Sequence, residues 1–86
     1  MPRKRAPTHL YSVSVSFFID EHAKERFERR ESIQIMTELV YNGTSERQAI
    51  ASLYRTARAA MTNPLAYAVL MEQDGKVVVR ARIEHH

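Results

Sequence analysis

The sequence predicts a small α+β protein, in which an antiparallel sheet is covered on one face by one long helix. Three observations support this fold class. Apolar and polar residues alternate strictly after Leu10, as in a half-buried strand. Residues 44–61 instead repeat their apolar side chains at helical spacing. Two further apolar segments flank Asp74-Gly75, a dipeptide typical of tight hairpins. The predicted order is strand, short helix, strand, long helix, strand, strand.

The length of 86 residues predicts one domain, because two separate cores would each be too small to fold easily. Residues 1–8 place Arg3, Lys4 and Arg5 between two prolines, which predicts a flexible basic arm. Residues 9–86 are then the single α+β domain.

The first predicted strand begins after Leu10. Its two faces differ in character, with Tyr11, Val13, Val15, Phe17 and Ile19 on one and Ser12, Ser14 and Ser16 on the other. Such alternation predicts that the first face packs on a core and the serine face lies in solvent.

The segment Asp20–Glu31 is almost entirely charged, and two structures fit it. One is a short exposed helix capped by Asp20, and the other is a long ordered loop. From Ile33 to Tyr41 the alternation returns and predicts a second strand. A helix through Met36, Leu39 and Val40 is the competing interpretation.

The long helix is predicted over Thr44–Met61. Asn42-Gly43 is a turn signal, and Thr44 or Ser45 would cap the helix. One side of the helix is apolar, carrying Ile50, Leu53, Tyr54, Ala57 and Met61. Pro64 ends it, because the residue before a proline avoids the helical conformation.

The predicted hairpin joins strands over Leu65–Glu72 and Lys76–Glu84. A two-residue turn at Asp74-Gly75 predicts that Leu70 faces Val79, Ala68 faces Ala81 and Ala66 faces Ile83. We expect this apolar face beneath the long helix. The other face would pair Tyr67 with Arg82, Val69 with Arg80 and Met71 with Val78.

That second hairpin face is the main candidate binding surface. Its predicted partner-binding residues are Tyr67, Val69, Met71, Arg80 and Arg82. Arginines beside an aromatic ring on an open sheet are typical of single-stranded nucleic-acid binders, and equally of protein interfaces. Arginines that only make the surface soluble are the alternative.

A second basic stripe is predicted on the long helix, from Arg47, Arg55 and Arg58. Together with the basic arm and a net charge of +3, these arginines suit an acidic partner. A solvated helix surface is again the alternative interpretation.

Several classes of activity lack their residues in this sequence. There is no cysteine, and neither glycine belongs to a phosphate-binding loop. None of the four histidines has the spacing of a metal ligand, and we expect Asp20 and His22 to be solvated and not a catalytic pair. We therefore expect no enzyme, no metal and no cofactor. We also expect a cytoplasmic protein without a membrane span, because the apolar runs are short. His85-His86 are either native or the remainder of a tag.

The order of elements resembles that of small sheet-and-helix inhibitors encoded by phages and mobile elements, including anti-CRISPR proteins. The resemblance rests on the strand from Ile33, the helix start Thr44–Ile50 and the Asp-Gly hairpin. It implies a stoichiometric inhibitor that docks on a protein complex with a nucleic-acid-handling role.

We therefore expect a non-enzymatic inhibitor or adaptor that binds such a complex. The alternative is a small basic protein that binds DNA or RNA directly, with an affinity that falls steeply with salt. A third interpretation is a homodimer or other homo-oligomeric structural module.

Overall fold

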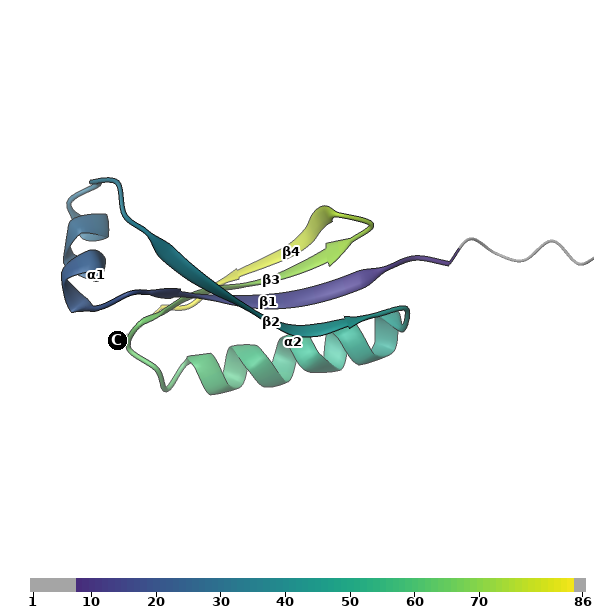
Figure 1. Ribbon diagram of the computed structural model, residues 1–86. Coiled ribbons are helices and arrows are strands. Elements are labelled where there is room, and N and C mark those ends of the chain that lie inside the picture. The colour runs from purple at the N-terminus through teal and green to yellow at the C-terminus, as the bar shows by residue number, and fades with distance from the viewer. Residues whose placement is uncertain (1–7, 85–86) are drawn as a thin grey trace, which may run out of the picture.

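The computed structural model describes residues 8–84 and confirms the predicted fold class and order of elements (Figure 1). The elements are β1 (Tyr11–Phe18), α1 (Glu21–Glu28), β2 (Ile35–Gly43), α2 (Glu46–Ala60), β3 (Ala66–Gln73) and β4 (Lys76–Arg82). The four strands form one antiparallel sheet in the order β2-β1-β3-β4. Strands β1 and β3 are therefore central, and β2 and β4 are the two edges.

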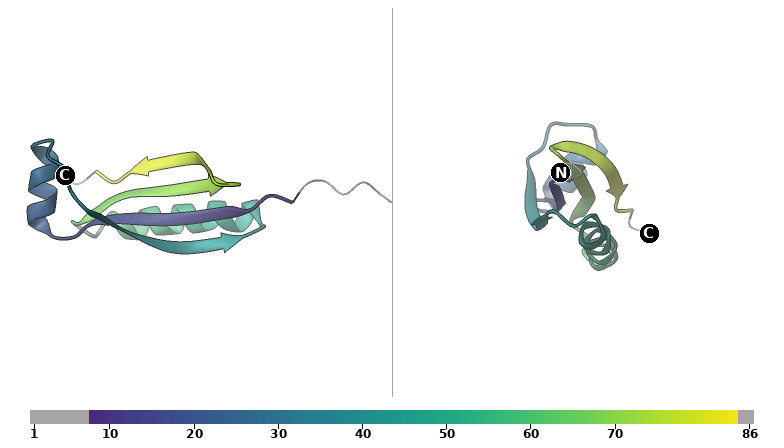
Figure 2. Two further views of the ribbon diagram at one scale, coloured as in Figure 1. Left: turned by 45° about the horizontal axis from the view of Figure 1, so that its top comes forward. Right: turned by 90° about the vertical axis from the view of Figure 1, so that its right-hand side faces the viewer.

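Helix α2 runs along one face of the sheet and packs on β1, β3 and β2 (Figures 1 and 2). The buried core lies between this helix and the central strands; its members include Val13, Val15, Leu53, Val69 and Met71. A helix with its side chains is about 10 Å wide, whereas four strands span about 19 Å. One helix therefore leaves part of the sheet, beside β4, without a cover.

Strand β1 follows its predicted alternation, but its serine face does not lie wholly in solvent. Ser16 is only 6% exposed, and its hydroxyl shares a hydrogen bond of 3.3 Å with the Thr37 hydroxyl. Tyr11, Val13 and Val15 are buried against α2, and the serines lie on the opposite face, which we call the outer face. There Ser12 donates a hydrogen bond of 3.3 Å to the Glu72 carboxylate. Ile19, predicted to continue the buried face, lies beyond the end of the strand and is exposed.

The segment around Leu39 is a strand, so the competing helix interpretation was wrong. An irregularity in the pairing with β1 leaves one extra residue in β2, between the partners of Val13 and Ser14. Leu39 therefore pairs with Ser14 on the outer face, whereas Tyr41 pairs with Val13 and packs on the core. The Tyr41 hydroxyl exchanges two hydrogen bonds of 3.2 Å with the backbone of Ser45, the residue that caps α2.

The charged segment after β1 forms the short helix α1, and not a loop. Asp20 caps it by accepting a hydrogen bond of 2.8 Å from the backbone N–H of Ala23. No residue of α1 is buried, as its composition predicted. The helix lies at one end of the sheet, well away from most of α2 (Figure 2).

The β3–β4 turn is where predicted, but the predicted register was wrong. Asp74 and Gly75 have φ angles of 52° and 82°, as a tight hairpin turn requires. Beyond the turn β4 contains one extra residue, Val78, between the partners of Glu72 and Met71. The observed pairs are Met71 with Val79, Leu70 with Arg80, Val69 with Ala81, and Ala68 with Arg82.

This shift exchanges the predicted faces of β3 over Ala68–Met71, whereas Ala66 lies in the core as predicted. Val69 and Met71, predicted to be exposed, are 0% and 4% exposed beneath α2. Leu70 and Ala68, predicted to lie in the core under α2, lie on the outer face beside the arginines. In β4 the predicted faces are correct for Ala81 and Ile83, which pack on the core, whereas Val78, predicted on the outer face, lines the same hollow as Val79.

Candidate functional site

The structure divides the predicted binding residues among different surroundings. Arg80 and Arg82 are exposed on the outer face, opposite Leu70 and Ala68. Val69 and Met71 lie in the core, and neither is on the outer face where the sequence predicted a binding surface. The basic arm of Arg3, Lys4 and Arg5 lies outside the described residues.

Tyr67 belongs to an aromatic cluster formed by Phe18, Phe27 and Tyr67. The three ring centroids lie 5.1–5.4 Å apart, with tilted or edge-to-face contacts. The Arg82 guanidinium lies 5.8 Å from the Phe27 ring and 5.9 Å from the Tyr67 ring. These contacts join α1 to the end of the sheet. The Tyr67 ring therefore has protein partners on several sides and is a poor platform for a stacked base.

The three helix arginines are all exposed, within an arc of about 80° around α2. At about 100° per residue, Arg47 lies about 20° and Arg58 about 40° from Tyr54 around α2. Arg55 instead lines a hollow on the β2 side of the helix, together with Val40. Only Arg47 and Arg58 therefore accompany the side of α2 that is turned toward β4.

An apolar groove lies between that side of α2 and strand β4. It encloses about 470 Å³ and is lined by Glu46, Ile50, Leu53, Tyr54, Ala57, Met71, Gln73, Val78, Val79 and Ala81. Tyr54 is 69% exposed beside it, and Val78 is 50% exposed. This α2–β4 groove was not predicted, because we assigned the whole apolar stripe of the helix to the core. The narrowness of one helix relative to four strands was the signal that could have revealed it.

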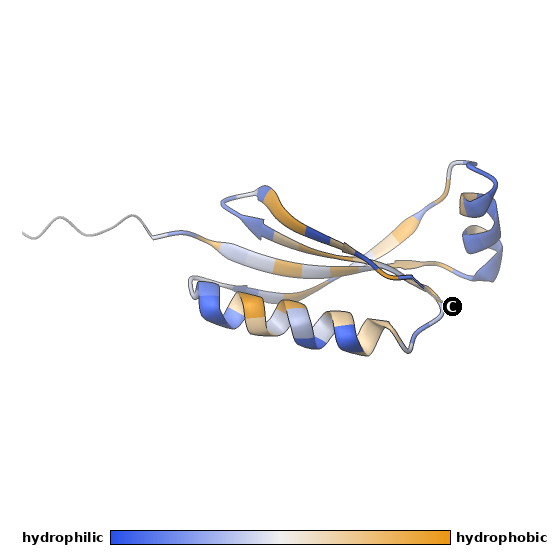
Figure 3. Cartoon of the chain, turned by 180° about the vertical axis from the view of Figure 1, so that it is seen from behind, coloured by the Kyte–Doolittle hydropathy of each residue, from blue (hydrophilic) through white to orange (hydrophobic). Residues whose placement is uncertain are grey.

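The free edge of β4 borders the groove. Within residues 8–84 no strand pairs with the edge of β4 that is turned away from β3. Along β4 the character changes from apolar at Val77–Val79 to basic at Arg80 and Arg82, visible as a change from orange to blue in Figure 3. The edge thus presents apolar side chains and positive charge next to backbone N–H and C=O groups that face no neighbouring strand.

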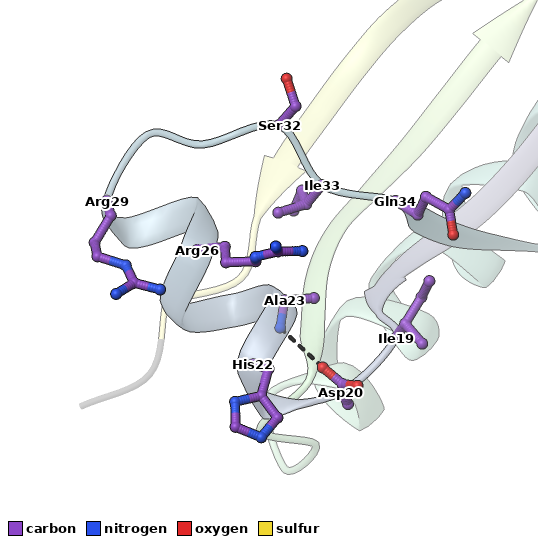
Figure 4. A pocket seen from close by; sticks show the side chains of 9 residues that line it. All are labelled: Ile19, Asp20, His22, Ala23, Arg26, Arg29, Ser32, Ile33 and Gln34. Atoms are coloured by element: carbon purple, nitrogen blue, oxygen red, sulfur yellow. Dashed lines mark hydrogen bonds between the residues drawn. The ribbon is translucent and has the colours of Figure 1, made fainter.

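A hollow of about 620 Å³ lies between α1 and the loop that leads to β2. Arg26 extends from α1 across it toward Ile33, and Arg29 lies at its far side (Figure 4). Arg29 is paired with Glu31 at 3.3 Å. The Asp20 carboxylate accepts the capping hydrogen bond of α1, and the His22 side chain is 90% exposed. The hollow is open and is lined by polar and apolar side chains in similar measure, and we assign it no chemistry.

Within residues 8–84 two titratable groups have shifted pKa values, and both have structural causes. Burial raises the pKa of Tyr11, and the nearby Glu46 carboxylate, to which its hydroxyl donates at 3.2 Å, raises it further. The pKa of Asp74 is lowered, first by a hydrogen bond from the backbone N–H of Leu10 and then by His9. Among residues 8–84 no group of three histidine or acidic side chains could hold a metal ion.

The comparisons with known proteins assign no family. No protein-family model matches the chain, and no curated protein or solved structure matches it. In the described part of the chain, neither helix has the length and hydropathy needed to cross a lipid bilayer.

Proposed function

We propose that this chain is a small, non-enzymatic binding protein that docks stoichiometrically on a protein partner. The observation that carries the proposal is the α2–β4 groove, an apolar surface left beside a free sheet edge. The resemblance in order of elements supports a partner complex that handles nucleic acid, with this protein as its inhibitor or adaptor.

Exposed apolar side chains support a protein partner. Tyr54 and Ile50 on α2 and Val77, Val78 and Val79 on β4 are all exposed. Soluble monomers rarely leave contiguous apolar surface of this kind without a use. Arginines at the border of an apolar patch, here Arg47 and Arg58, are typical of protein interfaces.

Direct binding of DNA or RNA is the second candidate. The net charge of +3 and the exposed Arg80 and Arg82 favour it. It ranks second because Tyr67, the aromatic residue expected to stack on a base, is held in the aromatic cluster.

Self-association is the third candidate, and it would use the other edge. Strand β2 exposes Ile35, Met36, Leu39 and Val40 and has one charged residue, Glu38. An apolar edge with little charge is prone to pair with its own copy.

The test compares three kinds of binding by the purified protein. Fluorescence anisotropy measures binding to single- and double-stranded DNA and RNA, at low and at physiological salt. Sedimentation measures self-association, and affinity capture from a cell lysate measures protein binding. The capture uses wild type, Val79→Lys and, as a matched control, Val40→Lys, because both valines are 39% exposed on edge strands.

We expect a protein captured in equimolar amount by wild type and Val40→Lys, and lost with Val79→Lys. Nucleic-acid binding that weakens steeply with salt and disappears in Arg80→Ala/Arg82→Ala would instead establish the second candidate. A concentration-dependent mass that Val40→Lys removes would establish the third.

A further inference from the structure

We propose that the free edge of β4 binds an extended partner segment as an added antiparallel strand, in which acidic and apolar residues alternate. This inference rests on the proposed function and specifies the chemistry of the partner segment.

The pairing of β4 with β3 determines which backbone N–H and C=O groups of β4 are free to bind a partner. Ile83 donates a hydrogen bond of 2.9 Å to the carbonyl of Tyr67, so its N–H points toward β3. In an antiparallel pair, alternate residues direct their N–H and C=O groups to the neighbour. From Val79 to Ile83 the pairing with β3 has no irregularity. The N–H and C=O groups of Arg80 and Arg82 therefore point away from β3, toward the free edge.

An added strand would place its side chains on two different surfaces. Residues opposite Arg80 and Arg82 would lie on the outer face, beside the two guanidinium groups. Residues opposite Val79 and Ala81 would lie on the other face, where both side chains line the α2–β4 groove. Alternation along the partner segment then matches the alternation of charged and apolar surfaces.

The charge of the edge selects an acidic segment. All three charged residues of β4, Lys76, Arg80 and Arg82, are basic. None of the ion pairs within residues 8–84 involves them. Two β4 strands paired with each other would bring these like charges together, which disfavours a second copy as the occupant. An acidic strand would neutralise them.

The first test is a titration of the ¹⁵N-labelled full chain with the peptide acetyl-Glu-Val-Glu-Val-Glu-amide. We expect amide shifts centred on β4 and on the side of α2 at Ile50 and Tyr54. The matched peptide with lysine in place of glutamate should bind at least tenfold more weakly. Equal binding of the two peptides, no binding of either, or shifts centred on β2 would overturn the inference.

Two substitutions at one position separate charge from backbone pairing. Arg80→Ala removes the charge and retains the N–H, and we expect about threefold weaker binding of the glutamate peptide. Arg80→Pro also removes the N–H that points outward, so binding should fall at least tenfold. Proline is tolerated where a strand N–H faces solvent, so the fold should persist, as unchanged β1 and β3 amide shifts would show.

Equal binding by Arg80→Ala and Arg80→Pro would overturn strand addition, because the outward N–H would then have no role. A partner that docks as a helix in the groove would give that result. Failure of the inference is distinguishable from failure of the proposed function. A captured partner that is lost with Val79→Lys would preserve the proposed function, even if the peptide does not bind.

Discussion

The carboxylate of Asp74, at the tip of the β3–β4 hairpin, accepts a hydrogen bond of 2.9 Å from the backbone N–H of Leu10. The Asp74 N–H in turn donates to the Leu10 carbonyl at 2.8 Å. His9 Nδ1 lies 2.6 Å from the other carboxylate oxygen. The hairpin turn and the residue that precedes β1 are thus joined across most of the sequence.

This contact predicts a pH-dependent stability. The pKa of Asp74 is lowered in the folded protein, so its ionised form stabilises the fold. That contribution is present above the ordinary pKa of an aspartate, about 4, and is lost as the pH falls through the lower folded value. The melting temperature of Asp74→Asn should be lower than that of wild type at pH 7, and this difference should shrink below about pH 4. A difference that is the same at pH 7 and pH 3 would contradict the assignment.

The register of the hairpin predicts opposite sensitivities at two valines. Val69 is fully buried and Val78 is half exposed. Val69→Ala should lower the free energy of unfolding by about 2 kcal/mol, because it removes two buried methyl groups and leaves a cavity. Val78→Ala should change it by less than about 0.5 kcal/mol. Urea denaturation measures both, and the reverse ranking would support the register expected from the sequence.

The order of elements could be predicted because each element has its own local signal. Serines alternate with apolar residues in β1, Ser45 caps α2, and Asp74-Gly75 forms the turn. The register of β4 could not be predicted, because Val77–Val79 are identical side chains that fit either face. The faces of β3 could not be predicted either, because Ala66–Met71 has no charged residue to mark the outer face. The binding groove was missed for a different reason, since it depends on the position of α2 relative to the four strands.

The aromatic cluster predicts that α1 depends on one side chain. Helix α1 has no buried residue, and Phe27 contacts Phe18 and Tyr67. Phe27→Ala should therefore increase hydrogen exchange of the α1 amides about five- to tenfold, as expected for a loss of about 1 kcal/mol. The core amides of β1 and β3 should exchange as before. His22→Ala is the control on the same helix, because that side chain is 90% exposed. Equal effects of the two substitutions would show that the cluster does not hold α1.

The basic residues of β4 also predict that this edge resists pairing with itself. Arg80→Val/Arg82→Val would leave an edge with few charges, so the mass measured by sedimentation should rise with protein concentration. Arg47→Val/Arg55→Val adds the same apolar groups to helix α2, which offers no free backbone for strand pairing, and serves as the control. Self-association of both variants alike would indicate a general loss of solubility, and would contradict a specific role of the β4 arginines.

The extra residue in β4 has a consequence for how related chains should be compared. Val77, Val78 and Val79 are identical, so the loss of any one of them removes the irregularity in the pairing of β4 with β3. Met71 would still lie opposite a valine, and Leu70 would still lie opposite Arg80. A one-residue gap in the valine run of an alignment is therefore compatible with the same interface. A gap between Arg80 and Arg82 is not, because it would turn one arginine toward the helix. In a search for relatives, the spacing of these two arginines is more informative than their distance from the turn.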